Sequence, residues 1–567
     1  MFRKASFLFL CLWIANATSV IGQQTRALQH RWEVDPPLGA IWEPQQTAQT
    51  IRFDVEQLRS RFAADRLETA QFIYREHNNP NFSQKTRALE LLLNALQSGE
   101  ESIPIRRAMV SAALSIADSS KAESIWLLAK SDTSLLPLVE RKLVEWRSSV
   151  AIEDWRKRIA EPNARPTELA TALEGLAVVG NAEDRLALQT VIRASQTSVT
   201  NRYLAALALG AQATDGLNAF AQNVMESDLV QRYLIAAHLL KRHSGATTAS
   251  QFQQIIADGD GSSQLVVYES MAQNMPDDCF GYAKQMVSHP DSGVRKTAVQ
   301  FLQTRPEVES IQLQATLLSD RNPEVRSIVA KNLSEKARQG HRELVNSIVA
   351  FHLNSDSWQG VEKSIEVAVA IEERTHCREF LRLLFHPRPE VKMTAGWALM
   401  ELGDEPETLA SMLAVAEKIA AELKASVFVA SSPNEEQIKL SYLHEAFGKF
   451  DYQAASRFLE KFIPKAEAQY GIVSRASAIW ALGKLNEGRD NEKLRGKLYE
   501  RMSDFSPINP EDVLVRFMSH LALGEMAQPE SREMLEKYRE GLPSPVAYAG
   551  NWALLQLDQA AAKKVEK

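Results

Sequence analysis

A short pattern of side chains returns about every 31 residues along this chain, and this periodicity restricts the possible folds more than any other feature. In the clearest copies, centred on Arg295, Arg326 and Lys392, an aliphatic residue precedes a basic one, a small or aliphatic residue follows at +3, and leucine follows at +7. With the basic residue as position zero, four further copies fit the same frame: Arg202, Arg232, Arg475 and Arg516. Weaker copies centre on Arg107, Arg141, Ala172, Gln264, Glu362, Leu440 and Ala547.

Positions −1, +3 and +7 of this frame lie along one stripe of an α-helix, because successive residues turn by about 100°. A repeat of this length has room for two helices and two short turns. The turn before the patterned helix carries residues suited to a helix start, as in Asn322-Pro323. Glycines after the pattern predict left-handed C-terminal caps at Gly210, Gly403, Gly483 and Gly524.

Each such unit can bury one face only against its neighbours, so the sequence predicts an all-α protein, an α-solenoid or superhelix of stacked antiparallel helix pairs. The turn Asn322-Pro323-Glu324-Val325-Arg326 and helix endings such as Trp480-Ala481-Leu482-Gly483 resemble HEAT repeats. Because the period is shorter than the about 40 to 47 residues usual for HEAT repeats, it is more similar to the compact, phycobilisome-lyase-like subtype. The resemblance covers residues 101–560 and implies about 12–14 HEAT-like repeats that serve as a scaffold or binding surface.

Tetratricopeptide repeats, with a period of about 34 residues, are the competing architecture. Their spacing of Trp, Leu-Gly and Tyr has no consistent copy in this chain. The HEAT-like arrangement is therefore the prediction.

The N-terminus has the order of a secretory signal: Arg3 and Lys4 precede an uncharged apolar run, which ends in small residues. This order predicts cleavage before Gln23 and an exported protein, periplasmic or extracellular, with no integral membrane span after cleavage. An uncleaved signal anchor is the alternative. The chain is thus divided into a signal peptide (1–22), an extended linker or N-terminal arm (23–50), an N-terminal helical cap (51–100) and the repeat array (101–560), with an insertion loop near 426–436.

The residues that usually carry chemistry do not assemble into a familiar motif. Only Cys279 and Cys377 follow the signal segment, about three repeats apart, which excludes a disulfide framework and a Cys-based zinc site. His386 recurs as His289 in the same turn of another repeat, which predicts a capping role and not a metal ligand. We therefore expect no catalytic residues, no metal and no cofactor. The net formal charge of −6 also argues against nucleic acid as a partner.

The basic residue at position zero could form a stripe for an acidic ligand, but we expect it to pair with turn carboxylates such as Asp320. Aromatic residues recur at two other positions of the frame, +1 and +5, which point about 160° away from the core stripe. We expect these rings to face outward as an aromatic binding stripe on the concave surface, formed by Tyr203, Tyr233, Trp397, Trp480, Phe517, Tyr548 and Trp552. The alternative is that each ring packs against the neighbouring repeat.

These observations predict a non-catalytic binding or scaffold protein that uses the concave solenoid face for a protein or peptide partner. A glycan-binding solenoid is one alternative, because stacked Trp and Tyr rings suit sugars. An enzyme or enzyme subunit whose site is built from dispersed polar groups is another.

Overall fold

A computed structural model describes residues 54–80, 82–98, 101–161, 164–212, 216–425, 433–465, 470–538 and 544–565. Throughout these residues the backbone is helical or forms turns, and no β-strand occurs among them. The predicted all-α fold is confirmed. The predicted signal peptide (1–22) and N-terminal arm (23–50) lie outside the described residues. Among the helices that are described, none has both the length and the apolar character needed to cross a bilayer.

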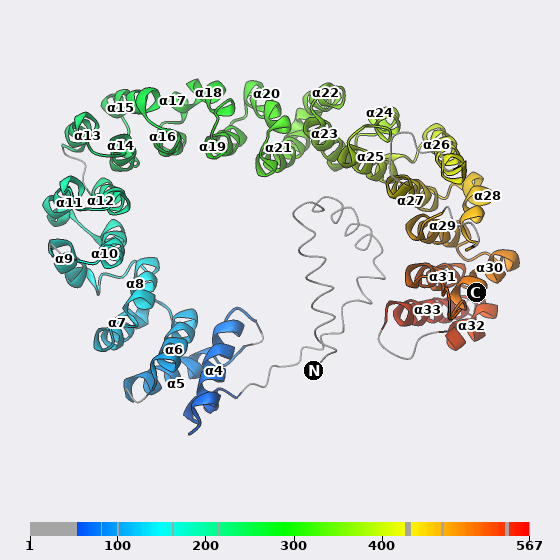
Figure 1. Ribbon diagram of the computed structural model, residues 1–567, viewed down its shortest axis with the longest axis horizontal. Helices are drawn as coiled ribbons and strands as arrows, with labels where there is room; N and C mark the ends of the chain where they lie inside the picture. The colour runs from blue at the N-terminus through cyan, green and yellow to red at the C-terminus, as the bar shows by residue number, and fades with distance from the viewer. Residues whose placement is uncertain are drawn as a thin grey trace. The chain divides into compact units, whose positions relative to one another are not determined.

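The described chain consists of two compact units, which we call the N-terminal unit (54–304) and the C-terminal unit (305–565). In each unit, antiparallel helix pairs succeed one another along the chain, and the second helix of each pair packs on the second helices before and after it (Figure 1). We call these stacked helices the second-helix layer, and their partners the first-helix layer.

The N-terminal unit contains eight stacked helices in its second-helix layer: α4 (Ala63–Glu76), α6 (Ile103–Ile116), α8 (Leu136–Glu145), α10 (Pro166–Val179), α12 (Val199–Gln212), α14 (Arg232–Leu240), α16 (Gly261–Asn274) and α19 (Ser292–Gln303). Its first-helix layer comprises α5 (Lys85–Ser98), α7 (Ala122–Ser131), α9 (Ile152–Ala160), α11 (Arg185–Arg193), α13 (Leu217–Glu226), α15 (Ala246–Asp258), α17 (Pro276–Gly281) and α18 (Ala283–Val287). A 3₁₀ helix, η2 (Val55–Arg59), precedes α4.

The C-terminal unit contains seven helices in its second-helix layer: α21 (Pro323–Lys336), α23 (Trp358–Ala370), α25 (Pro389–Leu402), α27 (Pro433–Lys449), α29 (Ile472–Leu485), α31 (Val513–Met526) and α33 (Pro545–Val565). Its first-helix layer comprises α20 (Val308–Ala315), α22 (Arg342–Leu353), α24 (Cys377–Leu383), α26 (Pro406–Ala425), α28 (Ser456–Leu459), α30 (Glu492–Met502) and α32 (Arg532–Tyr538).

All fourteen zero positions of the sequence repeat fall on helices of the second-helix layer, from Arg107 on α6 to Ala547 on α33. The stripe at −1, +3 and +7 is the core, as predicted: Val391, Ala395 and Leu399 on α25 are each 0% exposed. Burying such a stripe on both neighbours is what holds each pair in the array.

Two predicted boundaries differ from the structure. The helical cap (51–100) is not distinct from the array, because α4 packs on α6 and α5 pairs with α6 in the manner of the later repeats. The predicted insertion loop near 426–436 is too long at its C-terminal end, because α27 already begins at Pro433. Residues 426–432 lie outside the described residues.

The predicted left-handed glycine caps are wrong. Gly210, Gly483 and Gly524 lie inside α12, α29 and α31, and Gly403 ends α25 with a negative φ of −84°. The three helical glycines occupy +8 of the frame, where two second helices approach closely. A Cβ on Gly483 would lie 2.6 Å from Cα of Ala522 on α31, and a Cβ on Gly524 would lie 2.8 Å from Cα of Ala553 on α33. Glycine is therefore present for backbone contact and not for its left-handed conformation.

Candidate functional site

The recurring basic residue has a structural role, but its partners differ between repeats. Lys392 pairs with the Glu435 carboxylate at the start of α27 at 2.8 Å, as predicted, whereas Arg326 and Arg202 bond to backbone carbonyls. Arg326 Nη1 donates hydrogen bonds to the backbone oxygens of Asp320 (2.7 Å) and Arg321 (3.2 Å), so it uses the carbonyl of Asp320 and not its carboxylate. Arg202 donates likewise to the carbonyls of Ala194 and Ser195. Carbonyls at a helix C-terminus lack partners within the helix and carry partial negative charge, so a guanidinium satisfies them well. These arginines connect the two helices of a pair and are not available as a stripe for ligands.

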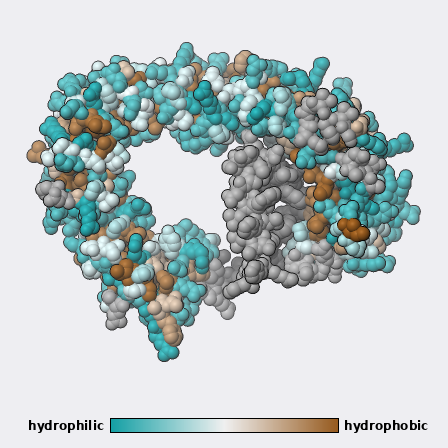
Figure 2. All heavy atoms as spheres, viewed as in Figure 1, coloured by the Kyte–Doolittle hydropathy of each residue, from teal (hydrophilic) through white to brown (hydrophobic). Residues whose placement is uncertain are grey.

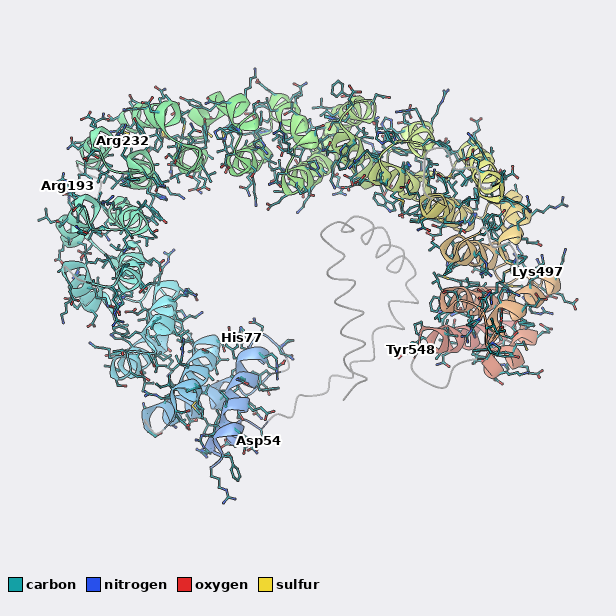
Figure 3. The ribbon with its side chains drawn as sticks, in the orientation of Figure 1. Asp54, His77, Arg193, Arg232, Lys497 and Tyr548 are labelled. Carbon is teal, nitrogen blue, oxygen red and sulfur yellow. The ribbon has the colours of Figure 1, made fainter. Side chains whose placement is uncertain are left out.

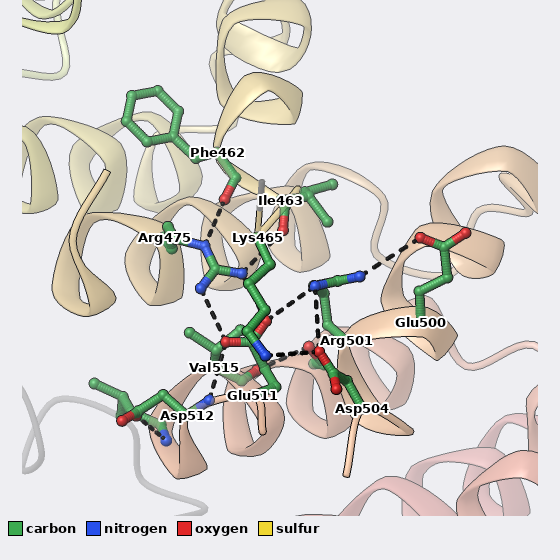
Figure 4. Close-up of polar contacts among 12 residues, drawn as sticks. Phe462, Ile463, Lys465, Arg475, Glu500, Arg501, Asp504, Glu511, Asp512 and Val515 are labelled. Atoms are coloured by element: carbon green, nitrogen blue, oxygen red, sulfur yellow. Dashed lines mark hydrogen bonds and ion pairs between the residues drawn. The ribbon is translucent and has the colours of Figure 1, made fainter. Parts of the chain in front are cut away.

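The repeat at Arg475 adds a carboxylate to this arrangement (Figure 4). Arg475 bonds both oxygens of Glu511 in a bidentate pair, at 2.9 and 2.7 Å, and also donates to the backbone oxygens of Phe462 and Ile463. Arg501 reaches the same carboxylate at 3.2 Å. Burial alone would raise the pKa of Glu511, but the hydrogen bonds from Arg475 and from the Asp512 amide lower it below its ordinary value.

The same network orders the loop between α30 and α31, residues 503–512. Lys465 pairs with Asp504 at 2.9 Å, and the Glu511 amide donates to the backbone oxygen of Asp504 at 3.0 Å. The hydrogen bond from Lys465 is the main cause that lowers the pKa of Asp504. The same loop carries Phe505 and Ile508, which are 51% and 97% exposed. Figure 2 shows hydrophobic residues (brown) on the visible face beside helices α29 to α33.

Two of the seven predicted binding aromatics are buried, which contradicts their predicted outward orientation. Phe517 is 2% exposed and Trp552 is 9% exposed. Their positions point away from the core stripe, but second helices also stack side by side, and the adjacent helix covers these flanks. A Cβ on Gly524 would lie 2.7 Å from Cζ3 of Trp552, so this ring lies directly over the glycine of the preceding repeat.

The other five predicted aromatics, Tyr203, Tyr233, Trp397, Trp480 and Tyr548, are half-buried. Trp480 lies close to Gly448 of the preceding repeat, and Lys484 Nζ lies 5.9 Å from its ring centroid. Tyr548 lies on α33, on the opposite side of the unit from Lys497 of α30 (Figure 3). Trp480 therefore combines the two expected arrangements: one part of the ring packs on the neighbouring repeat, and another part reaches solvent.

In the N-terminal unit, Tyr203 stacks on His238, with ring centroids 5.5 Å apart and an interplanar angle of 25°. Burial, with the nearby charge of Lys241, lowers the pKa of His238 to about 4, so the imidazole is neutral near pH 7. The hydroxyl of Tyr233 donates to Asp258 at 3.5 Å, and the Arg232 guanidinium lies 5.1 Å from the Tyr233 ring centroid. Both rings thus contact neighbouring side chains.

The predicted capping role of the turn histidines is confirmed. His289 Nδ1 accepts the Asp291 amide at 3.1 Å, and His386 Nδ1 accepts the Arg388 amide at 3.0 Å. Within the described part of the chain, no group of three or more His, Cys, Asp or Glu side chains is placed to hold a metal ion. Cys279 and Cys377 are buried and do not form a disulfide, and burial raises the pKa of Cys377 to about 12.

Two exposed phenylalanines lie outside the repeat frame, although a repeated dipeptide marks them in the sequence. Phe351 and Phe385 are 72% and 46% exposed, and each directly precedes a histidine at the end of a first helix. The repeated Phe-His dipeptide, one helix pair apart, was visible in the sequence. The dipeptide lies at the end of first helices, whereas the repeat frame describes second helices.

No family model and no curated protein matches this sequence. Among solved structures, the chain is similar to yeast importin-beta (Kap95p), at 13% identity over 90% of this chain and 73% of that one, with a TM-score of 0.43. It is also similar to a chain in a structure of Kap95p with RanGDP, at 14% identity over 90% and 72% of the two chains, with a TM-score of 0.49. A further importin-beta structure matches at 12% identity over 89% and 72%, with a TM-score of 0.43.

Such similarities carry no argument about what the chain binds, because one repeat architecture serves many functions. The fold itself follows from the helices: successive antiparallel pairs, a buried stripe at the same three positions, and proline or polar residues at the helix starts. The protein is an α-solenoid built from HEAT-like repeats.

Proposed function

We propose that this protein is an exported, non-catalytic binding or scaffold protein whose second-helix layer binds a protein or peptide partner. The observation that supports this function is the recurrence of half-buried rings on one layer of the C-terminal unit: Trp397 on α25, Trp480 on α29 and Tyr548 on α33. Aromatic residues are enriched at interfaces, because they supply a large contact area at a low cost in conformational entropy.

Packing against the neighbouring repeat prepares these rings for binding. The Trp480 ring is placed by Gly448 behind it and by Lys484 one turn along α29, so little rotamer freedom remains to be lost when a partner binds. Tyr203 in the N-terminal unit is held in a comparable way by its stack on His238. Rings at equivalent positions of successive repeats favour a partner that extends along the layer.

The same half-exposed tryptophans suit a glycan, because a sugar ring stacks on an aromatic face. This is the second candidate function, and it predicts a different response to glycosidase. Protein binding should survive glycosidase treatment of the exported fraction, whereas glycan binding should be lost.

The test is capture of partners from the exported fraction with the wild-type protein and with the double variant Trp397→Ala/Trp480→Ala. The control is Leu186→Ala, which removes a side chain that is 77% exposed in the first-helix layer. We expect a captured partner to be lost with the tryptophan variant and kept with the control. Equal capture by both variants would remove the support for this binding surface.

Export is tested separately. N-terminal sequencing of the mature protein should begin near Gln23, because the small residues before it suit signal cleavage. Recovery of intact Met1 in a soluble cytoplasmic fraction would contradict export and leave the binding function to be judged on its own test.

A further inference from the structure

Two exposed phenylalanines lie at equivalent places in the first-helix layer of the C-terminal unit. Phe351 is in the last turn of α22, and Phe385 follows the end of α24. The histidines after them have local roles: His386 caps a turn, and His352 is 7% exposed beneath the Phe351 ring, with centroids 5.2 Å apart. The cap and the burial thus explain the presence of the two histidines, but neither explains the phenyl rings, which are 72% and 46% exposed.

Cations lie in the same part of the layer. Arg382 Nη2 donates at 3.2 Å to the Leu353 carbonyl and to Asn354 Oδ1, which places its guanidinium at the C-terminal end of α22, the helix that carries Phe351. Lys418 Nζ of α26 lies 5.3 Å from the centroid of Phe385. In chain order over three successive first helices, rings and cations therefore alternate. We call Phe351, Arg382, Phe385 and Lys418 the Phe–cation row.

The two cations of the row are not neutralised by strong ion pairs. Within the described residues, Arg382 has hydrogen bonds to a carbonyl and an amide oxygen and no ion pair. The Lys418 contact with Glu422 is 4.0 Å long, and the two side chains are 65% and 43% exposed, so it contributes little. By contrast Lys439, the other cation near Phe385, is 2% exposed and pairs with Glu436 at 2.7 Å.

The row therefore presents apolar rings and positive charge in alternation. We propose that it binds an extended, acidic peptide segment of a partner protein, with apolar side chains on Phe351 and Phe385 and carboxylates on Arg382 and Lys418. Packed helices lie about 8–10 Å apart, and an extended chain advances about 3.3 Å per residue. One helix pair thus matches about three residues of the peptide, so apolar residues at i and i+3, with acidic residues between them, fit the row.

Single-stranded nucleic acid is the other polymer that such rings and cations could bind. Its affinity depends on neutralising many phosphates, and this row offers two cations on a chain with a net formal charge of −6. Charge therefore favours the peptide. The row lies on the first-helix layer, so this proposal is independent of the binding function assigned to the second-helix layer.

The test uses a fluorescein-labelled peptide of sequence Glu-Phe-Asp-Glu-Phe-Asp, with fluorescence anisotropy measured on the full chain. We expect binding that weakens as salt is added, because exposed charges are screened. The double variant Phe351→Ala/Phe385→Ala and the single variant Lys418→Glu should each weaken binding about tenfold or more, which corresponds to about 1.4 kcal/mol. Phe62→Ala, which removes a ring that is 56% exposed elsewhere, is the matched control and should bind normally.

Lys418→Glu keeps the test decisive if the double variant folds poorly, because the Lys418 side chain is 65% exposed. Three results would overturn the proposal. They are unchanged affinity in both row variants, equal binding of a peptide with lysine in place of each acidic residue, and tighter binding of a thymidine oligonucleotide that the row variants abolish. Trp397→Ala/Trp480→Ala should leave peptide binding unchanged, so a failure here is distinguishable from a failure of the proposed function.

Discussion

Replacing Gly483 with alanine tests the reason for glycine at position +8 of the repeat. An ideal Cβ at this position would lie 2.6 Å from Cα and 2.9 Å from Cβ of Ala522, where real contacts of this kind are about 3.4 Å or longer. The obstacle is the backbone of α31, so no side chain can rotate away. One of the two second helices must move by several tenths of an ångström, and overpacking of this kind costs about 1–3 kcal/mol.

Helix propensity acts in the opposite direction. Alanine is favoured over glycine by about 1 kcal/mol in a helix interior, so Gly483→Ala should be destabilising by about 2 kcal/mol at most in net free energy of unfolding. The matched control is Gly496→Ala in α30 of the same unit, where a Cβ would meet no atom within 4 Å. Without a clash, this change should stabilise the protein by about 0.5–1 kcal/mol.

Thermal and urea unfolding of both variants provide the measurement. We expect the unfolding midpoint to fall for Gly483→Ala and to rise for Gly496→Ala. The slopes of the urea transitions should be compared as well, because an array of repeats need not unfold in two states. If both variants are stabilised alike, then close helix approach does not explain these glycines and the account of the interface is wrong.

Three further predictions follow from packing and charge. Leu482→Ala should cost about 2–5 kcal/mol, because Leu482 is 1% exposed, and half-buried Trp480→Ala should cost clearly less; equal losses in thermal melts would make the ring a core element. Glu511→Gln leaves Arg475 buried without its carboxylate and should cost about 3–5 kcal/mol in urea unfolding. Because the pKa of Glu511 is lowered in the folded state, the ionised carboxylate stabilises the protein above the unfolded pKa, and this stabilisation is lost as the pH falls through the folded pKa. In thermal melts at acid pH, the wild type should therefore be no more stable than Glu511→Gln. The pKa of His238 is lowered to about 4 in the folded protein, so between about pH 6.5 and pH 4 the unfolded residue binds a proton and the folded one does not. The free energy of unfolding should therefore fall by at most about 3 kcal/mol over this range, and His238→Gln should reduce this pH dependence.

The repeat frame and the core could be predicted from the sequence because they depend on local geometry. Leucine at +7 and a small residue at +3 share one face of a helix whatever the helix packs against, so Leu399 and Ala395 were correctly assigned to the core. The caps formed by His289 and His386 are also local, since the ring and the amide that it accepts are two residues apart.

Whether the flanks of each second helix are exposed depends on the tertiary structure. A single helix shows that Phe517 and Trp552 point away from the core stripe, but only the stacking of α31 and α33 on their neighbours shows that those flanks are covered. The glycines illustrate the same limit: a glycine near the end of a helical pattern suits a cap, and only the 2.6 Å approach to Ala522 reveals that Gly483 is a helix contact. Arg326 likewise required the end of the preceding helix to be placed before its carbonyl partners could be recognised. The sequence by itself determined the helices, their register and the buried stripe, because these follow from 3.6 residues per turn; which outer positions are exposed was decided by packing between repeats, which no single helix encodes.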